Sequence, residues 1–180
     1  MKILVIVDMQ NDFVTGALGS KEAQAAVPNI VDLVETGEYD RIYATLDTHK
    51  SNYLKTLEGR KLPVPHCIEY TNGWLIQPDI LDALQRTETK VEYITKPTFG
   101  SFELRNCIEW DLPGKEDDCI DIVGVCTDIC VVSNALILRA ACPDTPIRAI
   151  VNACAGTTPE NHKAALAVMK ACQIDLKVVG

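Results

Sequence analysis

The chain lacks a long apolar run, a surplus of positive charge and any Cys-x-x-Cys pair, and each absence excludes a class of protein. The first apolar run, Ile3–Val7, stops at Asp8 and is too short for a signal peptide or a membrane-spanning helix. The net charge of -8 argues against nucleic-acid or anionic-membrane partners, which need a basic surface. With no secretory context, the eight cysteines are expected to be reduced thiols in a cytosolic protein.

The chain also lacks internal repeats, low-complexity segments and any Pro/Gly/Ser-rich run that would separate two domains. Of its 180 residues, 47% are hydrophobic, which is enough to close one substantial core. We therefore predict a single domain over residues 1–180. The acidic balance leaves small molecules as the expected ligands.

Short apolar runs alternate with segments of helical periodicity along the whole chain. The predicted strands are Ile3–Val7, Ile42–Leu46, Val91–Thr95, Ile120–Val125, Ile147–Val151 and Leu176–Val179. The predicted helices are Glu22–Glu35, Pro78–Gln85, Thr127–Ala141 and Pro159–Cys172. This alternation is typical of an α/β protein with a doubly wound parallel sheet. Residues 48–76 and 97–118 are expected to be irregular, and long loops in a compact domain are often functional.

The segment that ends at Cys130 has the pattern of a strand-to-helix turn that presents a catalytic nucleophile. An apolar strand runs into Gly124, after which Cys126 falls at a strand-to-helix turn and Cys130 in the first helical turn. Free amide N–H groups and the helix dipole at such a position favour a thiolate over a thiol. Both cysteines are candidate nucleophiles, although a buried cysteine is most often a small core residue.

Polar side chains follow four of the predicted strands at the point where each strand ends. Asp8 follows the first strand, Asp47 the second, Lys96 the third and Cys126 the fourth. Because ligands of an open parallel sheet bind outside the carboxyl ends of its strands, these side chains are expected to converge. Each one alone is more often a turn, surface or core residue, and only the joint pattern indicates a site.

These residue types together permit acyl transfer to water. A carboxylate such as Asp8 can take the proton of a cysteine thiol, and Lys96, kept extended by Pro97, would hold that carboxylate ionised and oriented. Backbone N–H groups between Cys126 and Cys130 are placed to stabilise the oxyanion that forms when a carbonyl is attacked. The sequence therefore predicts a hydrolase with a cysteine nucleophile.

A second polar group, in the loop after the second strand, has the composition of a metal site. Asp47 and His49 are two apart on an extended segment and point the same way, and the loop can bring Glu58 and His66 to them. Two imidazoles with carboxylates suit zinc, iron or manganese. The alternative is a polar loop with two ordinary histidines and an exposed Glu58. His162, in the last predicted helix, is interpreted as a surface residue.

Three sequence blocks resemble, in order and spacing, the signature blocks of the isochorismatase-like cysteine hydrolases. They are DMQNDF at 8–13, KPTFGSF at 96–102 and GVCTDIC at 124–130, and the similarity spans nearly the whole chain. The resemblance implies a three-layer α/β/α fold with a six-stranded parallel sheet.

The same resemblance implies roles for the residues of these blocks. The implied triad is Asp8, Lys96 and Cys130, with Cys130 rather than Cys126 as the nucleophile. A cis peptide is implied between Val125 and Cys126, where it would help to direct the amide N–H groups of Cys126 and Cys130 at the oxyanion.

The metal pattern resembles the nicotinamidase branch of this family, which differs in this respect from isochorismatases. The implied reaction is hydrolysis of nicotinamide to nicotinic acid and ammonia through a thioester on Cys130, a step of NAD salvage. One divalent metal ion, zinc before iron or manganese, would be held by Asp47, His49, Glu58 and His66 and would bind the pyridine nitrogen. Phe13 and Phe99 would contact the ring, and the protein is expected to be a homo-oligomer, as relatives often are.

One departure from the branch keeps other substrates open. Nicotinamidases usually carry an aromatic residue three positions before the second metal histidine, where this chain has Pro63. The aromatic contact would then come from Phe99, Tyr53 or Trp74, or the substrate would be another small amide or carbamoyl compound. A non-catalytic protein that binds a metal or small molecule is a further alternative, and a thiol redox protein is disfavoured because Cys-x-x-x-Cys is not the usual redox spacing.

Overall fold

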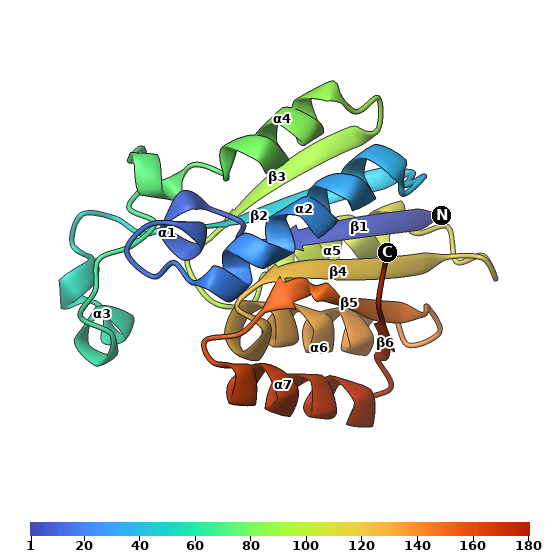
Figure 1. Cartoon of the computed structure of the whole chain (residues 1–180). Helices are drawn as coiled ribbons and strands as arrows, with labels where there is room; N and C mark the ends of the chain where they lie inside the picture. The colour runs from blue at the N-terminus through green and yellow to red at the C-terminus, as the bar shows by residue number, and fades with distance from the viewer.

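The computed structural model describes residues 1–180, which form one sheet covered by helices on both faces (Figure 1). The strands are β1 (Lys2–Val7), β2 (Arg41–Asp47), β3 (Lys90–Lys96), β4 (Cys119–Val125), β5 (Ile147–Ala155) and β6 (Asp175–Lys177). They pair in parallel in the order β3-β2-β1-β4-β5-β6. The predicted α/β class with six parallel strands is confirmed, and the last strand lies slightly earlier in the chain than expected.

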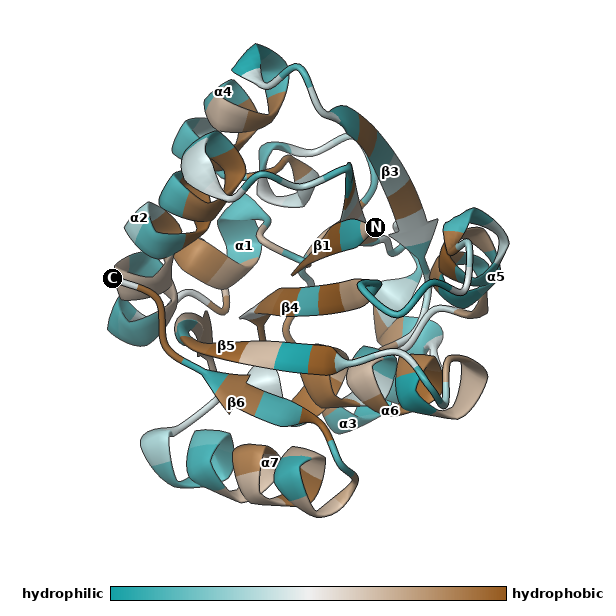
Figure 2. Ribbon diagram, turned by 90° about the vertical axis from the view of Figure 1, so that its right-hand side faces the viewer, coloured by the Kyte–Doolittle hydropathy of each residue, from teal (hydrophilic) through white to brown (hydrophobic).

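The helices pack in two layers, one on each face of the sheet. They are α1 (Asn11–Val14), α2 (Lys21–Thr36), α3 (Leu57–Lys61), α4 (Pro78–Arg86), α5 (Phe102–Asp111), α6 (Val132–Ala141) and α7 (Pro159–Ala171). Figure 2 shows α2 and α4 on one side of the strands and α5 and α6 on the other, and α7 joins the α5–α6 side of the core. None of these helices has the length and hydropathy required to cross a membrane.

The two layers follow from the alternation of side chains along the central strands. In β1, Leu4 and Ile6 belong to the core beneath α2 and α4, whereas Ile3 and Val5 belong to the core beneath α5 and α6. A strand buried on both faces needs apolar residues at nearly every position, and this explains the continuous apolar runs in the sequence.

Two segments that the sequence predicts to be irregular contain helices. Residues 97–118 include α5, where Leu104 and Ile108 form the buried stripe while Phe102 and Trp110 are exposed. The exposed aromatic residues disguise the helical period, because a helix normally turns its large apolar side chains inward. Residues 48–76 contain α3 and two single 3₁₀ turns, Tyr53–Lys55 and Asn72–Trp74, in an otherwise irregular connection.

The chain reverses its direction of winding between β1 and β4, and a crevice forms there at the carboxyl ends of the strands. Asp8 leaves β1 in the left-handed region, at φ 51°, so the chain turns out of the sheet directly after the strand. Beside it, a Cβ atom on Gly124 would lie 2.1 Å from the carbonyl oxygen of Val7. Glycine therefore lets β4 run close to β1 at the edge where the candidate residues end.

Candidate active site

Lys96 lies at the centre of the converging polar side chains. It ends β3, is 2% exposed, and directs its Nζ atom between three groups at the carboxyl edge of the sheet. Nζ is 2.6 Å from Asp8 Oδ2 and 3.6 Å from Cys130 Sγ, and it donates to the carbonyl of Thr98 at 3.0 Å. Burial alone would lower the pKa of Lys96, but the charge of Asp8 raises it above its usual value. The structure thus brings together the three residues that the sequence selects.

Asp8 is fully buried and held on two sides. Thr45 Oγ1 donates to Asp8 Oδ1 at 2.7 Å, while Oδ2 faces the ammonium of Lys96. Burial raises the pKa of Asp8 above its ordinary value, although Lys96 opposes the shift. A carboxylate with a raised pKa is a stronger base, which suits it to accept a proton from a thiol.

Cys130 differs in protonation from the sequence-based expectation. It lies in a π-helical turn, Thr127–Val131, that precedes α6, and its side chain is buried. Burial raises the pKa of Cys130 well above its ordinary value, and the nearby charge of Asp8 acts in the same direction while Lys96 opposes it. The expected activation by a helix terminus is therefore outweighed, and Cys130 rests as a thiol.

The turn that precedes Cys130 has the implied backbone. The peptide between Val125 and Cys126 is cis, and the carbonyl of Cys126 accepts hydrogen bonds from the amides of Ile129 and Val131 at 3.0 and 3.1 Å. Burial raises the pKa of Cys126 to about 12, so its side chain is also a thiol. Cys126 has no contact with Lys96 comparable to that of Cys130, and this favours Cys130 as the nucleophile.

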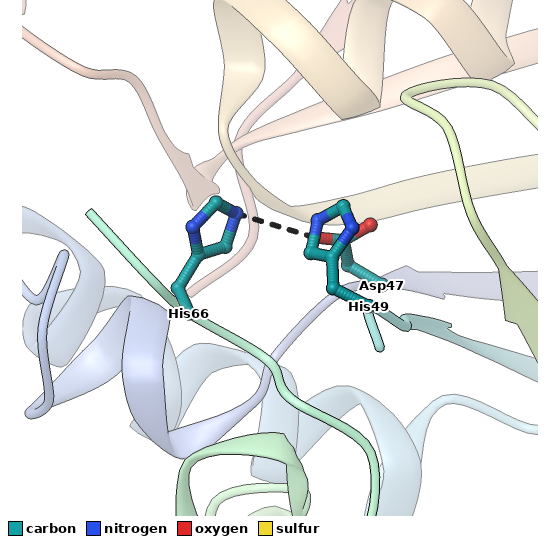
Figure 3. A group of neighbouring side chains, drawn as sticks. All are labelled: Asp47, His49 and His66. Atoms are coloured by element: carbon teal, nitrogen blue, oxygen red, sulfur yellow. Dashed lines mark ion pairs between the residues drawn. The ribbon is translucent and has the colours of Figure 1, made fainter. Parts of the chain in front are cut away.

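The second polar group forms a compact cluster beside Lys96. Figure 3 shows Asp47, His49 and His66 pointing toward one another, and their ligand atoms all lie within 4.8 Å. Asp47 Oδ2 is 2.9 Å from His49 Nε2 and 3.5 Å from His66 Nε2. Glu58 Oε1 completes the group at 3.6 Å from His49 Nε2 and 3.7 Å from His66 Nε2. Oδ1 of Asp47 is 3.8 Å from Lys96 Nζ, so the two clusters adjoin.

The chemistry of Asp47, His49 and His66 fits a divalent metal ion, and Glu58 is a candidate for the fourth ligand of a tetrahedral site. With bonds of about 2.1 Å, ligand atoms of such a site lie about 3.4 Å apart, close to most of the observed separations. His66 Nδ1 bonds the carbonyl of Val64 at 2.8 Å, which leaves its Nε2 lone pair directed into the cluster. His49 Nε2 is buried and has no hydrogen-bond partner, although it lies 2.9 Å from Asp47 Oδ2. An unpaired buried nitrogen of this kind is what a metal ion would satisfy.

The electrostatics of the cluster keep Asp47 ionised. Burial alone would raise its pKa, but His49, His66 and Lys96 together lower it below its usual range. Burial raises the pKa of Glu58, a half-buried residue at the rim, more than the imidazoles lower it. A cation bound between these groups would supply the charge that the two carboxylates need.

A cavity of about 310 Å³ connects the thiol with the metal cluster. Its lining includes Cys126, Cys130, Asp47, Glu58 and His66 together with the apolar side chains of Phe13, Leu18, Leu62, Phe99, Val125, Ile129 and Ala155. Its size is that of a small-molecule site. A larger open groove along α2 contains none of the converging residues and is not part of this site.

The predicted aromatic contacts are only partly found in the cavity. Phe13 and Phe99 line it, whereas Tyr53 packs behind the metal cluster, 4.7 Å from the His49 ring centre. The Trp74 indole donates to Thr48 outside the cavity wall. Pro63 is exposed, and its neighbour Leu62 supplies the wall on that side, a role that the sequence did not indicate.

His162 is not a plain surface residue, contrary to the sequence-based interpretation. It is partly buried, and its Nδ1 lies 2.8 Å from Thr127 Oγ1 in the turn that carries Cys130. Thr45 was also missed, although its position two residues before Asp47 on β2 places both side chains on one face.

Comparisons with known proteins agree with this geometry. A model of the isochorismatase domain matches residues 2–177. The nicotinamidase/pyrazinamidase of Mycobacterium tuberculosis is 28% identical over 98% of both chains. Crystal structures of a Bacillus subtilis nicotinamidase (25% identity, TM-score 0.80, 98% of both chains) and of a Pyrococcus horikoshii pyrazinamidase in complex with zinc (26%, 0.75, 99% of both) are similar throughout. The chain belongs to the isochorismatase family.

Proposed function

We propose that this protein is a metal-containing cysteine amidohydrolase that converts nicotinamide to nicotinic acid and ammonia. The observation that carries the proposal is the position of Lys96, whose ammonium lies between Asp8 and Cys130 and directly beside the metal cluster. Cys130 and Asp47 line the same cavity. The name of the Mycobacterium tuberculosis relative, a nicotinamidase/pyrazinamidase, supports the same substrate.

The cavity suits a small, flat, neutral amide. The aromatic rings of Phe13 and Phe99 line it, and Leu62 adds a further apolar side chain to its wall. Asp47, His49, Glu58 and His66 would hold one zinc ion, with iron or manganese as alternatives, and the bound ion would supply an anchor for the pyridine nitrogen. The carboxamide would then face Cys130.

In the first half of the reaction, Asp8 removes the proton of the Cys130 thiol as Sγ attacks the amide carbon. The carbonyl oxygen becomes an oxyanion, for which the backbone amides of Cys126 and Cys130 are the proposed donors. Asp8 returns the proton to the amide nitrogen, the C–N bond breaks, and ammonia leaves a thioester on Cys130.

In the second half, Asp8 takes a proton from water, and the resulting hydroxide attacks the thioester carbon. The C–S bond breaks, the proton returns to Cys130, and the carboxylic acid leaves. Lys96 stabilises the ionised form of Asp8 in both halves, because its ammonium is 2.6 Å from Oδ2.

Release of ammonia from nicotinamide by the purified protein, with zinc present or removed by a chelator, tests the proposal. Cys130→Ala should lower kcat by roughly 10⁴-fold or more because the nucleophile is lost, whereas Cys126→Ala should retain most of the activity. Full activity of Cys130→Ala would refute the assigned nucleophile. Turnover of other small amides but not of nicotinamide would favour the second candidate, a related amidohydrolase, for which Leu62 in the wall beside Pro63 is the supporting observation.

The fourth metal ligand has its own test. Glu58→Gln removes a charged ligand and should weaken zinc binding by at least about tenfold, measured by competition with a chromophoric chelator. Glu69→Gln is the matched control, because Glu69 lies in the same connection with a similar side-chain exposure but pairs with Lys50. Equal zinc affinity in the two variants would remove Glu58 from the ligand set. The homo-oligomeric state and the cytosolic location stay predictions.

A further inference from the structure

Gln10 is a fully buried polar residue that the reaction described above does not use. Its side chain makes three hydrogen bonds, all to the backbone. Nε2 donates to the carbonyl of Asp47 at 2.8 Å and to the carbonyl of Trp74 at 2.8 Å, and Oε1 accepts from the amide of Asp47 at 2.7 Å. A single carboxamide therefore satisfies both backbone groups of a residue 37 positions away.

The need for this bond arises from the way β1 ends. The register of β1 and β2 stops at the pair Val7 and Thr45, because the chain turns out of the sheet at Asp8. Asp47 continues β2 beyond that point and still pairs with Lys96 of β3 on its other side. Its backbone would have no neighbour on the β1 side, and buried N–H and C=O groups without partners are destabilising.

The carboxamide of Gln10 takes the place of the missing strand. It offers one donor and one acceptor to Asp47, as the backbone of a neighbouring strand would. Its second donor fixes the carbonyl of Trp74, and the Trp74 indole in turn donates to Thr48 at 2.8 Å, one residue after Asp47. Gln10 thus holds the end of β2 directly at Asp47 and indirectly, through Trp74, at Thr48.

We propose that Gln10 is a positioning residue for the metal ion. It fixes the backbone of Asp47 at the point where β1, which ends before Asp8, no longer pairs with β2. This inference rests on the metal site of the proposed function. A carboxylate ligand is directed by its own backbone, so loss of the Gln10 contacts would let Asp47 Oδ2 move relative to His49 and His66. Gln10 touches neither the reacting atoms nor the metal ligand atoms and would act only through Asp47.

The test compares zinc affinity in Gln10→Met, Gln10→Asn and a control, Gln85→Met, by competition with a chromophoric chelator. Gln10→Met keeps the length of the side chain but removes all three bonds, and Gln10→Asn keeps an amide that is one methylene too short. Zinc binding is expected to weaken about ten- to a hundredfold in Gln10→Met and measurably in Gln10→Asn. Gln85 is exposed on α4 and should give wild-type affinity.

Two further readouts separate positioning from a general loss of structure. The unfolding of each metal-free variant in denaturant shows that it is folded, and excess zinc should restore most of the ammonia release of Gln10→Met. Wild-type zinc affinity in Gln10→Met, or activity that excess zinc does not restore, would overturn the inference. If Gln10→Met does not fold, unchanged affinity in Gln10→Asn would overturn it equally. Absence of zinc binding by the wild-type protein would instead refute the proposed metal site.

Discussion

The buried ammonium of Lys96 determines how charge is distributed among the reacting side chains. Burial raises the pKa of Asp8, and the ammonium of Lys96, 2.6 Å from Oδ2, opposes that rise and so favours the carboxylate form. Cys130 receives less help, because its Sγ lies at 3.6 Å from Nζ and close to the charge of Asp8. Lys96 therefore favours the charged form of Asp8 more strongly than that of Cys130, and the thiolate is expected to form only during attack.

Alkylation of Cys130 as a function of pH tests this resting state. Because the folded protein raises the pKa of Cys130, its thiolate is scarce near neutral pH, and its rate of reaction with iodoacetamide should keep rising beyond pH 9 without a plateau. The rate for each cysteine can be followed by mass spectrometry of the digested protein, with the exposed Cys172 as an internal reference. A plateau for Cys130 below pH 7 would show a resting thiolate and contradict the assignment.

Among the secondary-structure elements, α6 joins two chain segments that line the cavity. Its Asn134 is 1% exposed and makes three hydrogen bonds. Oδ1 accepts from the amide of Ser101 at 2.9 Å, and Nδ2 donates to the carbonyls of Cys130 and Phe99 at 2.8 and 3.1 Å. One side chain on the helix thereby fixes the nucleophile turn and the loop that carries the Phe99 wall.

Replacement of Asn134 by alanine should affect both stability and substrate binding. Three backbone groups would lose their partner, so we expect the free energy of unfolding to fall by about 1–3 kcal/mol in urea titrations. KM for the amide should rise because the loop that carries Phe99, a proposed contact of the substrate ring, loses a hydrogen bond, and kcat should fall because the Cys130 carbonyl loses its donor. Asn106→Ala, an exposed change on α5, is the matched control and should be neutral in both measurements. A loss of stability with unchanged KM would show that the Phe99 loop does not depend on Asn134.

The positions of Asp8, Asp47 and Lys96 could be predicted because parallel strands all end at the same edge of the sheet. What the sequence did not contain was the partner of each group. Thr45 and Gln10 act through hydrogen bonds that exist only once β1 and β2 lie side by side. The raised pKa of Cys130 could not be predicted from the residues around it either, because burial by distant segments outweighs the effect of the nearby helix terminus.

The fold was predictable where both faces of an element are buried and less so where one face is exposed. The apolar runs identified all six strands, because helices cover the sheet on both sides. In α5 the pair Leu104 and Ile108 carries the helical period, but the exposed Phe102 and Trp110 break it. The order of the strands follows from crossover handedness and packing over the whole chain, which no single segment records.

At the scale of the whole molecule, the metal cluster joins a long connection to the edge of the sheet. Asp47 belongs to β2, whereas His49, Glu58 and His66 come from residues 48–76, where helical structure is short. An ion bound by all four would be present only in the folded protein, because these ligands are dispersed in the unfolded chain. Its binding free energy therefore adds to the free energy of unfolding.

Removal of the metal should lower the melting temperature of the protein, by an amount that depends on how tightly the cluster binds the ion. At a free zinc concentration a hundred times the Kd, the stabilisation is about 2.7 kcal/mol, which corresponds to roughly 5–10 °C in Tm for a chain of this size. Differential scanning fluorimetry with zinc and then with excess chelator measures the difference. His49→Ala should abolish it, whereas His162→Ala, which alters the one histidine outside the cluster, should retain it even if its own Tm is lower. A zinc-dependent shift that persists in His49→Ala would mean that the ion binds elsewhere on the molecule.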